Sequence, residues 1–407
     1  MANVSSSNGL EKRPKLRFPG FDEPYKQCRI GDIYAERSQR GASDMELLSV
    51  TMNDGVKPRS EIEGKDNSSE DKSNYKIVRK GDMVYNSMRM WQGANGISPC
   101  DGIVSPAYTV LMPKQEINNG YFAALFKSVT LINEFRKNSQ GMTSDTWNLK
   151  YPQIETIKVQ IPSVSEQDKV SELFSVLDER IATQAQLVES LKKYKRGVFE
   201  AVFSQKLRLV PTELQKPWKQ YKLSDFATRV TRKNGNQTDI PLTISAQYGL
   251  IDQRDFFSKM VASTDMSGYY LLQKGEFAYN RSTSNEYPFG SIKRLELYPM
   301  GAVSTLYLCF AIKEEVVNSD LAKWYFESSQ WYKGINNICA EGARNHGLLN
   351  VPTDGFFNTV HTLPSDPNEQ LAVVDYLSNI QKKYEAAQRC LQAIENLRSG
   401  LLRQLFI

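Results

Sequence analysis

The chain holds few residues of the kinds that carry out catalysis. Only two histidines, His346 and His361, occur in 407 residues, which excludes a histidine-rich metal site. A lone histidine could pair with a carboxylate for acid–base chemistry, but its usual role is structural. The five cysteines are scattered without paired spacing, which favours reduced thiols over a disulfide framework or a zinc site.

Motifs that bind nucleotides or cut phosphodiesters are also missing. The sequence has no glycine-rich phosphate loop and no Asn- or Asp-Pro-Pro-aromatic step, with which amino-methyltransferases hold a base amine. Glu61, Glu63 and Lys65 look like the acidic–lysine cluster of nucleases, but they lie in a polar stretch without an upstream Pro-Asp partner. We therefore expect no catalytic residue and no metal site in this chain.

Composition indicates a folded, soluble protein with room for two or three domains. Hydrophobic residues make up 40% of the chain and aromatic residues 11%. The formal net charge of +5 permits contact with a polyanion but is weak evidence for one. No stretch approaches ~18 uninterrupted apolar residues, and the first residues lack the apolar core of a signal peptide. We expect an intracellular protein.

Two long segments, 165–203 and 368–406, repeat each other. Glu166-Gln167 corresponds to Glu369-Gln370 at a constant shift, and an apolar-Pro step precedes each segment. In both segments apolar residues alternate steps of four and three, a seam that keeps two helices in contact. The seams are Val170, Phe174, Leu177, Ile181, Gln184, Val188, Leu191, Lys195, Val198 and Val202, and Val373, Leu377, Ile380, Tyr384, Ala387, Leu391, Ile394, Arg398, Leu401 and Leu405.

The matched seams favour a coiled coil over two unrelated amphipathic helices in separate cores. Each helix would run for roughly 39 residues, or ~58 Å at 1.5 Å per residue. Lys195 and Arg398 occupy one matched seam position. There they would either fix the register of the pair or extend out of the seam at a frayed end.

The regions ahead of the helices repeat more faintly. Segment 80–86 matches 274–280, and 49–56 matches 243–250 with Gly55 over Gly249. The runs 83–85 and 303–308 are typical of strands, the stretches 121–135 and 320–334 of amphipathic helices, and 61–74 of a surface loop. We therefore predict a mixed α/β domain at 1–164, a helix at 165–204, a second domain at 205–365 and a second helix at 366–407.

These motifs resemble the specificity subunit of type I restriction–modification enzymes over nearly the whole chain. The most specific are the segment from Val84 to Gly93, the segment from Arg344 to Asn350 and the two Glu-Gln-headed helices. The resemblance implies two tandem target-recognition domains, related by a pseudo-twofold axis and separated by two long antiparallel coiled-coil helices. Each domain would read one half of a bipartite, asymmetric site in double-stranded DNA.

The resemblance also implies partners. Two methyltransferase subunits would bind S-adenosylmethionine and methylate adenine, and restriction subunits would use ATP and Mg for translocation and cleavage. This chain would be non-catalytic, hold no cofactor, contact no membrane and act in the prokaryotic cytoplasm. We assign docking of the partners to helix residues Leu177, Ile181, Val188, Leu191, Ile380, Tyr384, Leu391 and Ile394.

Polar residues at the tips of matched loops are the candidate DNA contacts. Asn, Gln and Arg can bond the edges of adenine or guanine, and Ser and Thr suit phosphates. The candidates are Asn53, Lys57, Arg59, Asn86, Ser87, Arg89, Trp91, Gln92, Gln247, Tyr248, Gln253, Arg254, Asn280, Arg281, Ser282, Thr283 and Ser284.

Not all of these candidates are equally promising. Residues shared by both copies, such as Asn86 and Asn280, are expected to close turns, because different targets need different readers. Arg89, Arg281 and Gln253 are the strongest candidates for base contacts. The alternatives are a scaffold that binds peptides or sugars, and an enzyme with an unfamiliar site.

Overall fold

The computed structural model describes residues 2–3, 13–41, 44–52, 55–66, 68–245, 248–256, 265–284, 286–339 and 347–407. The chain forms two compact units, residues 1–185 with 389–407, and residues 186–388. The helices α5 (Val164–Phe203) and α11 (Pro367–Gln404) each contribute to both units. In the described part of the chain, no helix is long and apolar enough to cross a membrane.

The first unit is built on a four-stranded antiparallel sheet in the order β4-β11-β8-β9. Residues of α2 and α3 share one buried cluster with Met83, Tyr85 and Leu111 of the sheet. The strands are β1 (Ala2–Asn3), β2 (Leu16–Arg17), β3 (Lys26–Arg29), β4 (Tyr34–Glu36), β5 (Leu48–Thr51), β6 (Gly55–Pro58), β7 (Lys76–Val78), β8 (Met83–Asn86), β9 (Asn95–Ile97), β10 (Gly102–Val104), β11 (Tyr108–Pro113) and β12 (Lys158–Ile161). The helices are α1 (Ile30–Ile33), α2 (Asn119–Leu125), α3 (Val129–Asn138) and α4 (Tyr151–Ile154).

The second unit repeats this topology with the sheet order β14-β21-β18-β19. The two-stranded ladders also correspond: β3–β12 to β13–β22, β7–β10 to β17–β20, and β5–β6 to β15–β16. The predicted internal repeat is therefore confirmed. The strands are β13 (Lys219–Lys222), β14 (Ala227–Val230), β15 (Leu242–Ser245), β16 (Gly249–Asp252), β17 (Tyr270–Gln273), β18 (Phe277–Asn280), β19 (Ser291–Arg294), β20 (Met300–Val303), β21 (Leu308–Ile312) and β22 (Val360–Leu363), and the helices are α6 (Leu223–Phe226), α7 (Gln253–Phe256), α8 (Ser319–Glu327), α9 (Tyr332–Ile338) and α10 (Thr353–Phe357).

Corresponding hairpins close at corresponding residues. Thr51 pairs with Gly55 in β5–β6, and Ser245 pairs with Gly249 in β15–β16. The two glycines have φ angles of +70° and +79°, which residues with a Cβ adopt only at a cost. The glycines that the sequence comparison aligned therefore occupy the same backbone position in each unit.

Three predicted elements differ from the structure. The stretch 121–135 is two helices, because the Ser128 side chain accepts a hydrogen bond from the Leu131 amide and starts α3 anew. The stretch 320–334 is likewise divided into α8 and α9. The predicted strand 303–308 is a turn between β20 and β21, in which the Tyr307 amide donates to the Ser304 carbonyl at 3.1 Å.

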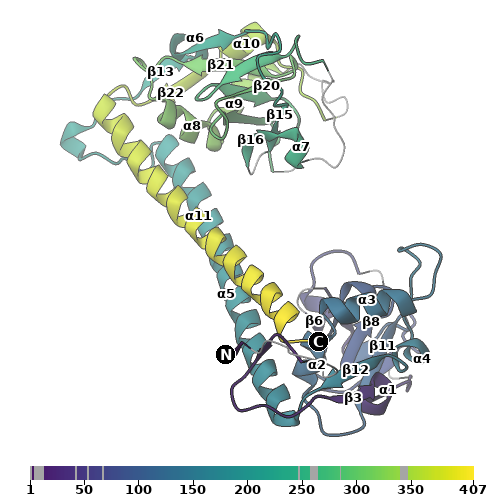
Figure 1. The fold of residues 1–407 in the computed structure, drawn as a ribbon. Coiled ribbons are helices and arrows are strands. Elements are labelled where there is room, and N and C mark those ends of the chain that lie inside the picture. Colours follow the sequence, from purple (N-terminus) through teal and green to yellow (C-terminus); the bar gives the residue numbers. More distant parts are fainter. Residues whose placement is uncertain are drawn as a thin grey trace. The chain divides into compact units, whose positions relative to one another are not determined.

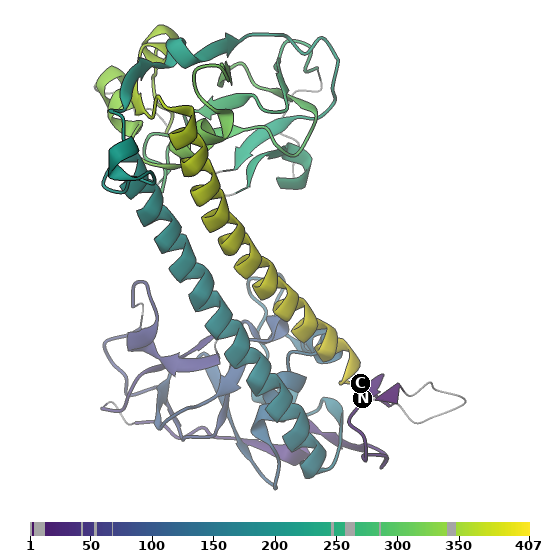
Figure 2. The same ribbon diagram turned by 90° about the vertical axis from the view of Figure 1, so that its left-hand side faces the viewer.

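The helices α5 and α11 pack side by side and antiparallel within each unit (Figure 1 and Figure 2). In the first unit the ring of Phe174 stacks on that of Phe406, with centroids 5.8 Å apart. In the second, Phe199 of α5 and Val373 of α11 share a buried cluster. All the predicted seam residues are buried or half-buried, so the seam is confirmed.

The two basic seam residues contact the opposite helix. Arg398 Nε lies 2.5 Å from the carboxylate of Asp178, which indicates that Arg398 fixes the register rather than extending into solvent. The ammonium of Lys195 lies 5.6 Å from the ring centroid of Tyr384. Burial lowers the pKa of Lys195.

The Glu-Gln heads of the helices fasten each helix to its unit. Glu166 is 1% exposed and receives two hydrogen bonds from Arg17, at 2.9 and 2.8 Å. Glu369 is 2% exposed and receives two from Arg208, at 2.6 and 2.9 Å. The aromatic residue of each matched Pro-aromatic step adds a third: Tyr25 donates to Glu166 at 3.2 Å, and the Trp218 indole to Glu369 at 3.0 Å.

The following glutamines complete the attachment. Gln167 accepts a hydrogen bond from the Asn118 amide at 3.0 Å, and Gln370 accepts one from the Asn318 amide at 2.8 Å. Asn118 and Asn318 in turn cap α2 and α8. The matched motif is thus explained by buried hydrogen bonding inside each unit.

Candidate nucleic-acid interface

In the first unit the predicted contact loop is a tight turn after β8. Asn86 Oδ1 accepts a hydrogen bond from the Met88 amide at 3.0 Å, so this side chain closes the turn. Ser87 is 4% exposed, and its hydroxyl lies 2.9 Å from that of Thr109. The structure therefore argues against Ser87 as a DNA contact and gives Asn86 a role in the turn.

Two polar side chains of this turn are not bonded within the described part of the unit. Arg89 is exposed and Gln92 is half-buried, and neither side chain has a partner among the residues the structure describes. The backbone beneath them is fixed, because the Arg89 amide donates to the Asn86 carbonyl at 3.0 Å and the Gln92 amide to the Arg89 carbonyl at 2.9 Å. Met90, which is 0% exposed, holds the turn in the core. A preorganised Arg and Gln suit bidentate bonds to guanine and adenine edges.

Trp91 packs within the unit, although we predicted it as a DNA contact. Its indole N–H donates to the Met88 carbonyl at 3.0 Å, and the edge-to-face contact with Trp147 has centroids 5.2 Å apart. Arg136, on α3, lies 5.6 Å from the Trp91 ring. Sequence analysis missed Trp147 and Arg136, because only the fold brings them beside the turn.

In the second unit the matched loop 280–284 begins with the same side-chain hydrogen bond as the turn after β8. Asn280 Oδ1 accepts a hydrogen bond from the Ser282 amide at 3.0 Å, as Asn86 does in its own turn. The amide and the hydroxyl of Thr283 both donate to the Gly347 carbonyl, at 2.7 and 3.1 Å. Ser282 and Ser284 are exposed, and Ser284 Oγ accepts a hydrogen bond from the Tyr287 amide at 3.3 Å.

Arg281 is bonded inside the second unit, which counts against it as a base reader. Its guanidinium donates to the Leu306 carbonyl at 2.9 Å and to the Val351 carbonyl at 3.4 Å. The Leu349 amide donates to the Arg281 carbonyl at 3.0 Å. Arg281 therefore joins three segments of the fold, whereas Arg89 at the matched loop of the first unit has no such bond among the described residues.

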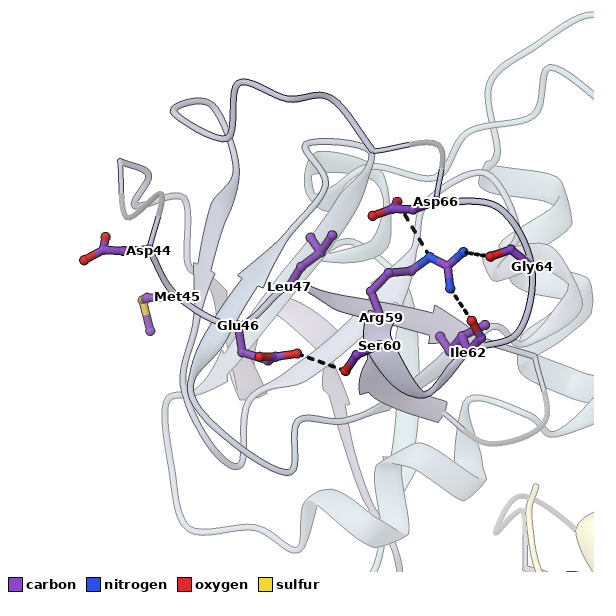
Figure 3. A pocket seen from close by; sticks show the side chains of 9 residues that line it. All are labelled: Asp44, Met45, Glu46, Leu47, Arg59, Ser60, Ile62, Gly64 and Asp66. Carbon is purple, nitrogen blue, oxygen red and sulfur yellow. Dashed lines mark hydrogen bonds and ion pairs between the residues drawn. The ribbon is translucent and has the colours of Figure 1, made fainter.

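The first predicted hairpin site contains a structural arginine. Arg59 donates to the carbonyls of Ile62 at 2.5 Å and Gly64 at 2.9 Å, and its Nε lies 3.7 Å from the Asp66 carboxylate (Figure 3). These residues line an open cleft of about 540 Å³. Arg59 thus holds the start of the predicted surface loop. Lys57 is half-buried on β6 and has an interaction of its own.

The second hairpin site offers one exposed aromatic side chain, Tyr248, which is 61% exposed. Gln253 Nε2 donates to the Leu242 carbonyl at 3.2 Å, so its amide is used inside the unit. Arg254 Nη2 lies 2.6 Å from the Asp252 carboxylate, and this side-chain hydrogen bond lowers the pKa of Asp252. Asn53 and Gln247 lie outside the described residues.

The helix residues assigned to partner docking do not form an exposed face. Leu177, Val188 and Ile380 are 8%, 8% and 6% exposed, and the others are half-buried. The apolar side chains that the two helices expose are different ones: Val176, Leu187, Tyr194, Leu371, Tyr376 and Leu397.

Neither metal chemistry nor acid–base chemistry is prominent in the described residues. Among them no group of three His, Cys, Asp or Glu side chains could hold a metal ion. His361 is 2% exposed, with Nε2 2.8 Å from the Thr359 hydroxyl and Nδ1 3.1 Å from the Tyr325 hydroxyl. Because the Thr359 hydroxyl donates to the Phe356 carbonyl at 2.6 Å, Nε2 donates to that hydroxyl. Burial lowers the pKa of His361, which favours the neutral ring. His346 lies outside the described residues.

Comparison with known structures finds the same fold. The crystal structure of a type I restriction-modification system S subunit from M. genitalium is similar over 97% of this chain and 99% of that chain, with a TM-score of 0.57 and 13% identity. A structure described as the structural basis of complex assembly and conformational transition of the type I R-M system covers 96% of this chain and 99% of its own, with a TM-score of 0.54 and 13% identity. A search of curated proteins found no match.

A family model matches one segment in the first half of the chain. Residues 23–193 match the model described as the type I restriction modification DNA specificity domain. The match spans the turn that carries Arg89 and Gln92 and the Glu-Gln head of α5. It includes the loop that differs between the units and Glu166 of the attachment that they share, but not Arg17. Residues 23–193 are therefore similar to the type I restriction modification DNA specificity domain.

Proposed function

We propose that the chain is the specificity subunit of a type I restriction–modification system and recognises a bipartite, asymmetric target in double-stranded DNA. The domains 1–164 and 205–365 would each read one half of the target, and the helices 165–204 and 366–407 would join the two readers. The observation that carries this proposal is the duplicated framework. Both units have the same order of strands and the same buried attachments, yet their matched loops present different side chains.

The asymmetry of the target follows from the polar groups that each loop presents. The first unit presents Arg89 and Gln92 on a fixed turn, while the arginine of the matched loop, Arg281, is bonded to backbone carbonyls. Arginine prefers guanine and glutamine prefers adenine in the major groove. Two loops that begin with the same Asn-closed turn and present different side chains favour different base sequences.

Catalysis in this proposal belongs to partner subunits. Two methyltransferase subunits would bind S-adenosylmethionine and methylate adenine, and restriction subunits would use ATP and Mg²⁺. Docking of these partners would use apolar side chains that the helices expose, among them Leu187, Tyr194 and Leu397. This role replaces the one that we assigned to the seam residues.

A map of methylated adenines in cells with and without the gene tests the proposal. We expect one two-part motif with unequal halves and a fixed gap to disappear with the gene. Replacing residues 205–365 by the same domain of a related chain should change one half of the motif only. An unchanged map, or a perfect palindrome with the chain acting as a single protomer, would contradict the proposal. A scaffold for peptides or sugars would leave the map unchanged, and its binding would lack the steep loss of affinity with rising salt that counterion release causes.

A further inference from the structure

The loop between α3 and α4 in the first unit is a closed hairpin with a fixed shape. The amide of Gln140 donates to the carbonyl of Asn148 at 3.0 Å, and the amide of Asn148 donates back at 2.8 Å. At the tip, the Thr146 amide donates to the Thr143 carbonyl at 2.9 Å, and the Thr146 hydroxyl accepts from the Thr143 amide at 3.1 Å. The backbone of the loop is therefore bonded to itself at both ends.

Gly141 makes this closure possible. Its φ angle is +139°, and a Cβ atom at this position would lie 2.6 Å from the Thr146 carbonyl oxygen. Any other residue would force the two sides of the loop apart. The glycine thus keeps the following residue at a defined place on the tip.

That residue, Met142, is 100% exposed. Single exposed apolar side chains are common on protein surfaces, so exposure alone carries little weight. The contacts around Met142 distinguish it from other exposed apolar residues. The Leu149 amide donates to the Ser87 carbonyl at 2.8 Å, and Trp147 contacts Trp91, so the hairpin is fastened to the turn that presents Arg89 and Gln92.

We propose that Met142 is an apolar wedge that enters the base stack of the half-site read by the first unit. This inference rests on the proposed function, since it requires that unit to bind DNA. Proteins insert Met and similar side chains between base steps, and pyrimidine–purine steps are the easiest to unstack. Met142 therefore selects a TA or CA/TG step beside the base pairs that Arg89 and Gln92 contact.

The charges around the hairpin fit this placement. Arg136 and Lys150, at the base of the loop, are exposed and suit the phosphates on either side of the wedge. Asp145 lies at the tip, where its carboxylate would repel a phosphate but can accept a hydrogen bond from a cytosine amino group. The tip is thus suited to bases and the base of the loop to the backbone.

Fluorescence of 2-aminopurine tests the wedge directly. The full chain, purified with the methyltransferase subunits that accompany it, is bound to duplexes that carry the methylation motif found in cells. 2-Aminopurine replaces adenine at successive positions of the first unit's half-site. Unstacking raises its fluorescence, so we expect a rise at one step. Met142→Ala should abolish the rise and weaken binding about tenfold, and Met142→Leu should keep both.

The control is Val129→Ala, which removes another exposed apolar side chain of the same unit, 54% exposed on α3, and should change neither readout. Circular dichroism of each variant shows whether the fold is kept. If the fluorescence rise persists in Met142→Ala, or if the wild type binds its motif with no rise at any step, the wedge is overturned while the proposed function stands. If the wild type shows no preference for the motif, the proposed function itself fails.

Discussion

Removing the Glu166 carboxylate tests how firmly α5 is attached to the first unit. The carboxylate is 1% exposed and pairs with a guanidinium that is 8% exposed, through hydrogen bonds of 2.9 and 2.8 Å from Arg17. Glu166→Ala leaves that guanidinium buried without its partner, which costs about 3 to 5 kcal/mol. The start of α5 should then separate from the unit more often. At 1.4 kcal/mol for each factor of ten, backbone amides that exchange with solvent during this separation should exchange about two to four powers of ten faster.

Hydrogen exchange measured peptide by peptide separates the two units, which a single unfolding curve does not. The peptides around β3 and the first turn of α5 should show the acceleration, and peptides of β13 and β22 should not. A double variant, Arg17→Met with Glu166→Leu, should restore most of the protection, because apolar residues of similar size can replace a buried pair. If the double variant exchanges as fast as Glu166→Ala, or if both units accelerate equally, the unpaired charge is not the cause.

Arg89→Ala should relax the sequence preference in one half of the methylation motif and leave the other half unchanged, and equal loss of both half-sites would instead mark a phosphate contact. Arg281→Ala should mainly destabilise the second unit, because it breaks hydrogen bonds to two carbonyls. Burial lowers the pKa of His361 to about 4. Below a pH of about 6.5, the unfolded state therefore binds a proton at this residue that the folded state does not bind. The second unit should therefore keep its full stability above pH 6.5 and lose about 3 kcal/mol as the pH falls to 4; an NMR titration of His361 with a midpoint near 6.5 would refute this. Inserting one heptad into each of α5 and α11 should lengthen both by ~10 Å and shift or abolish the spacing between half-sites, and unchanged spacing would exclude the helices as the ruler.

The long helices and the repeat were predictable because they depend on patterns that survive divergence. A seam is a property of spacing, so Phe174 and Leu377 can differ in size and still be buried at matched positions. The glycines at 55 and 249 were recognisable because their backbone conformation excludes most other residues. The Glu-Gln heads were visible as a repeat, but not their partners, because the fold brings Arg17 to Glu166 from 149 residues away.

The contact residues were harder to predict, because the type of a side chain does not show whether its polar group is already used. Arg89 and Arg281 both lie in the matched loops, at different positions, and among the described residues only Arg281 donates to carbonyls of distant segments. Gln253 is likewise bonded inside its unit, through Nε2 to the Leu242 carbonyl. Met142, which we propose as a wedge, does not stand out in the sequence, because an exposed methionine resembles any other apolar residue until the loop that carries it is known.

The division between matched and unmatched residues explains how such a chain can change its target without losing its fold. The matched polar groups are paired, and their carboxylates are at most 13% exposed: Glu166 with Arg17, Glu369 with Arg208, and beside the sheet strands Asp82 with Arg37 and Glu276 with Arg232. A substitution at any of these positions would leave the charge of its partner unpaired, and both units keep the same kind of pair. The free groups, such as Arg89, stabilise nothing inside the unit among the described residues, and replacing one alters only what it binds. The loops can therefore diverge one residue at a time, while the attachments that hold them in place remain the same in both units.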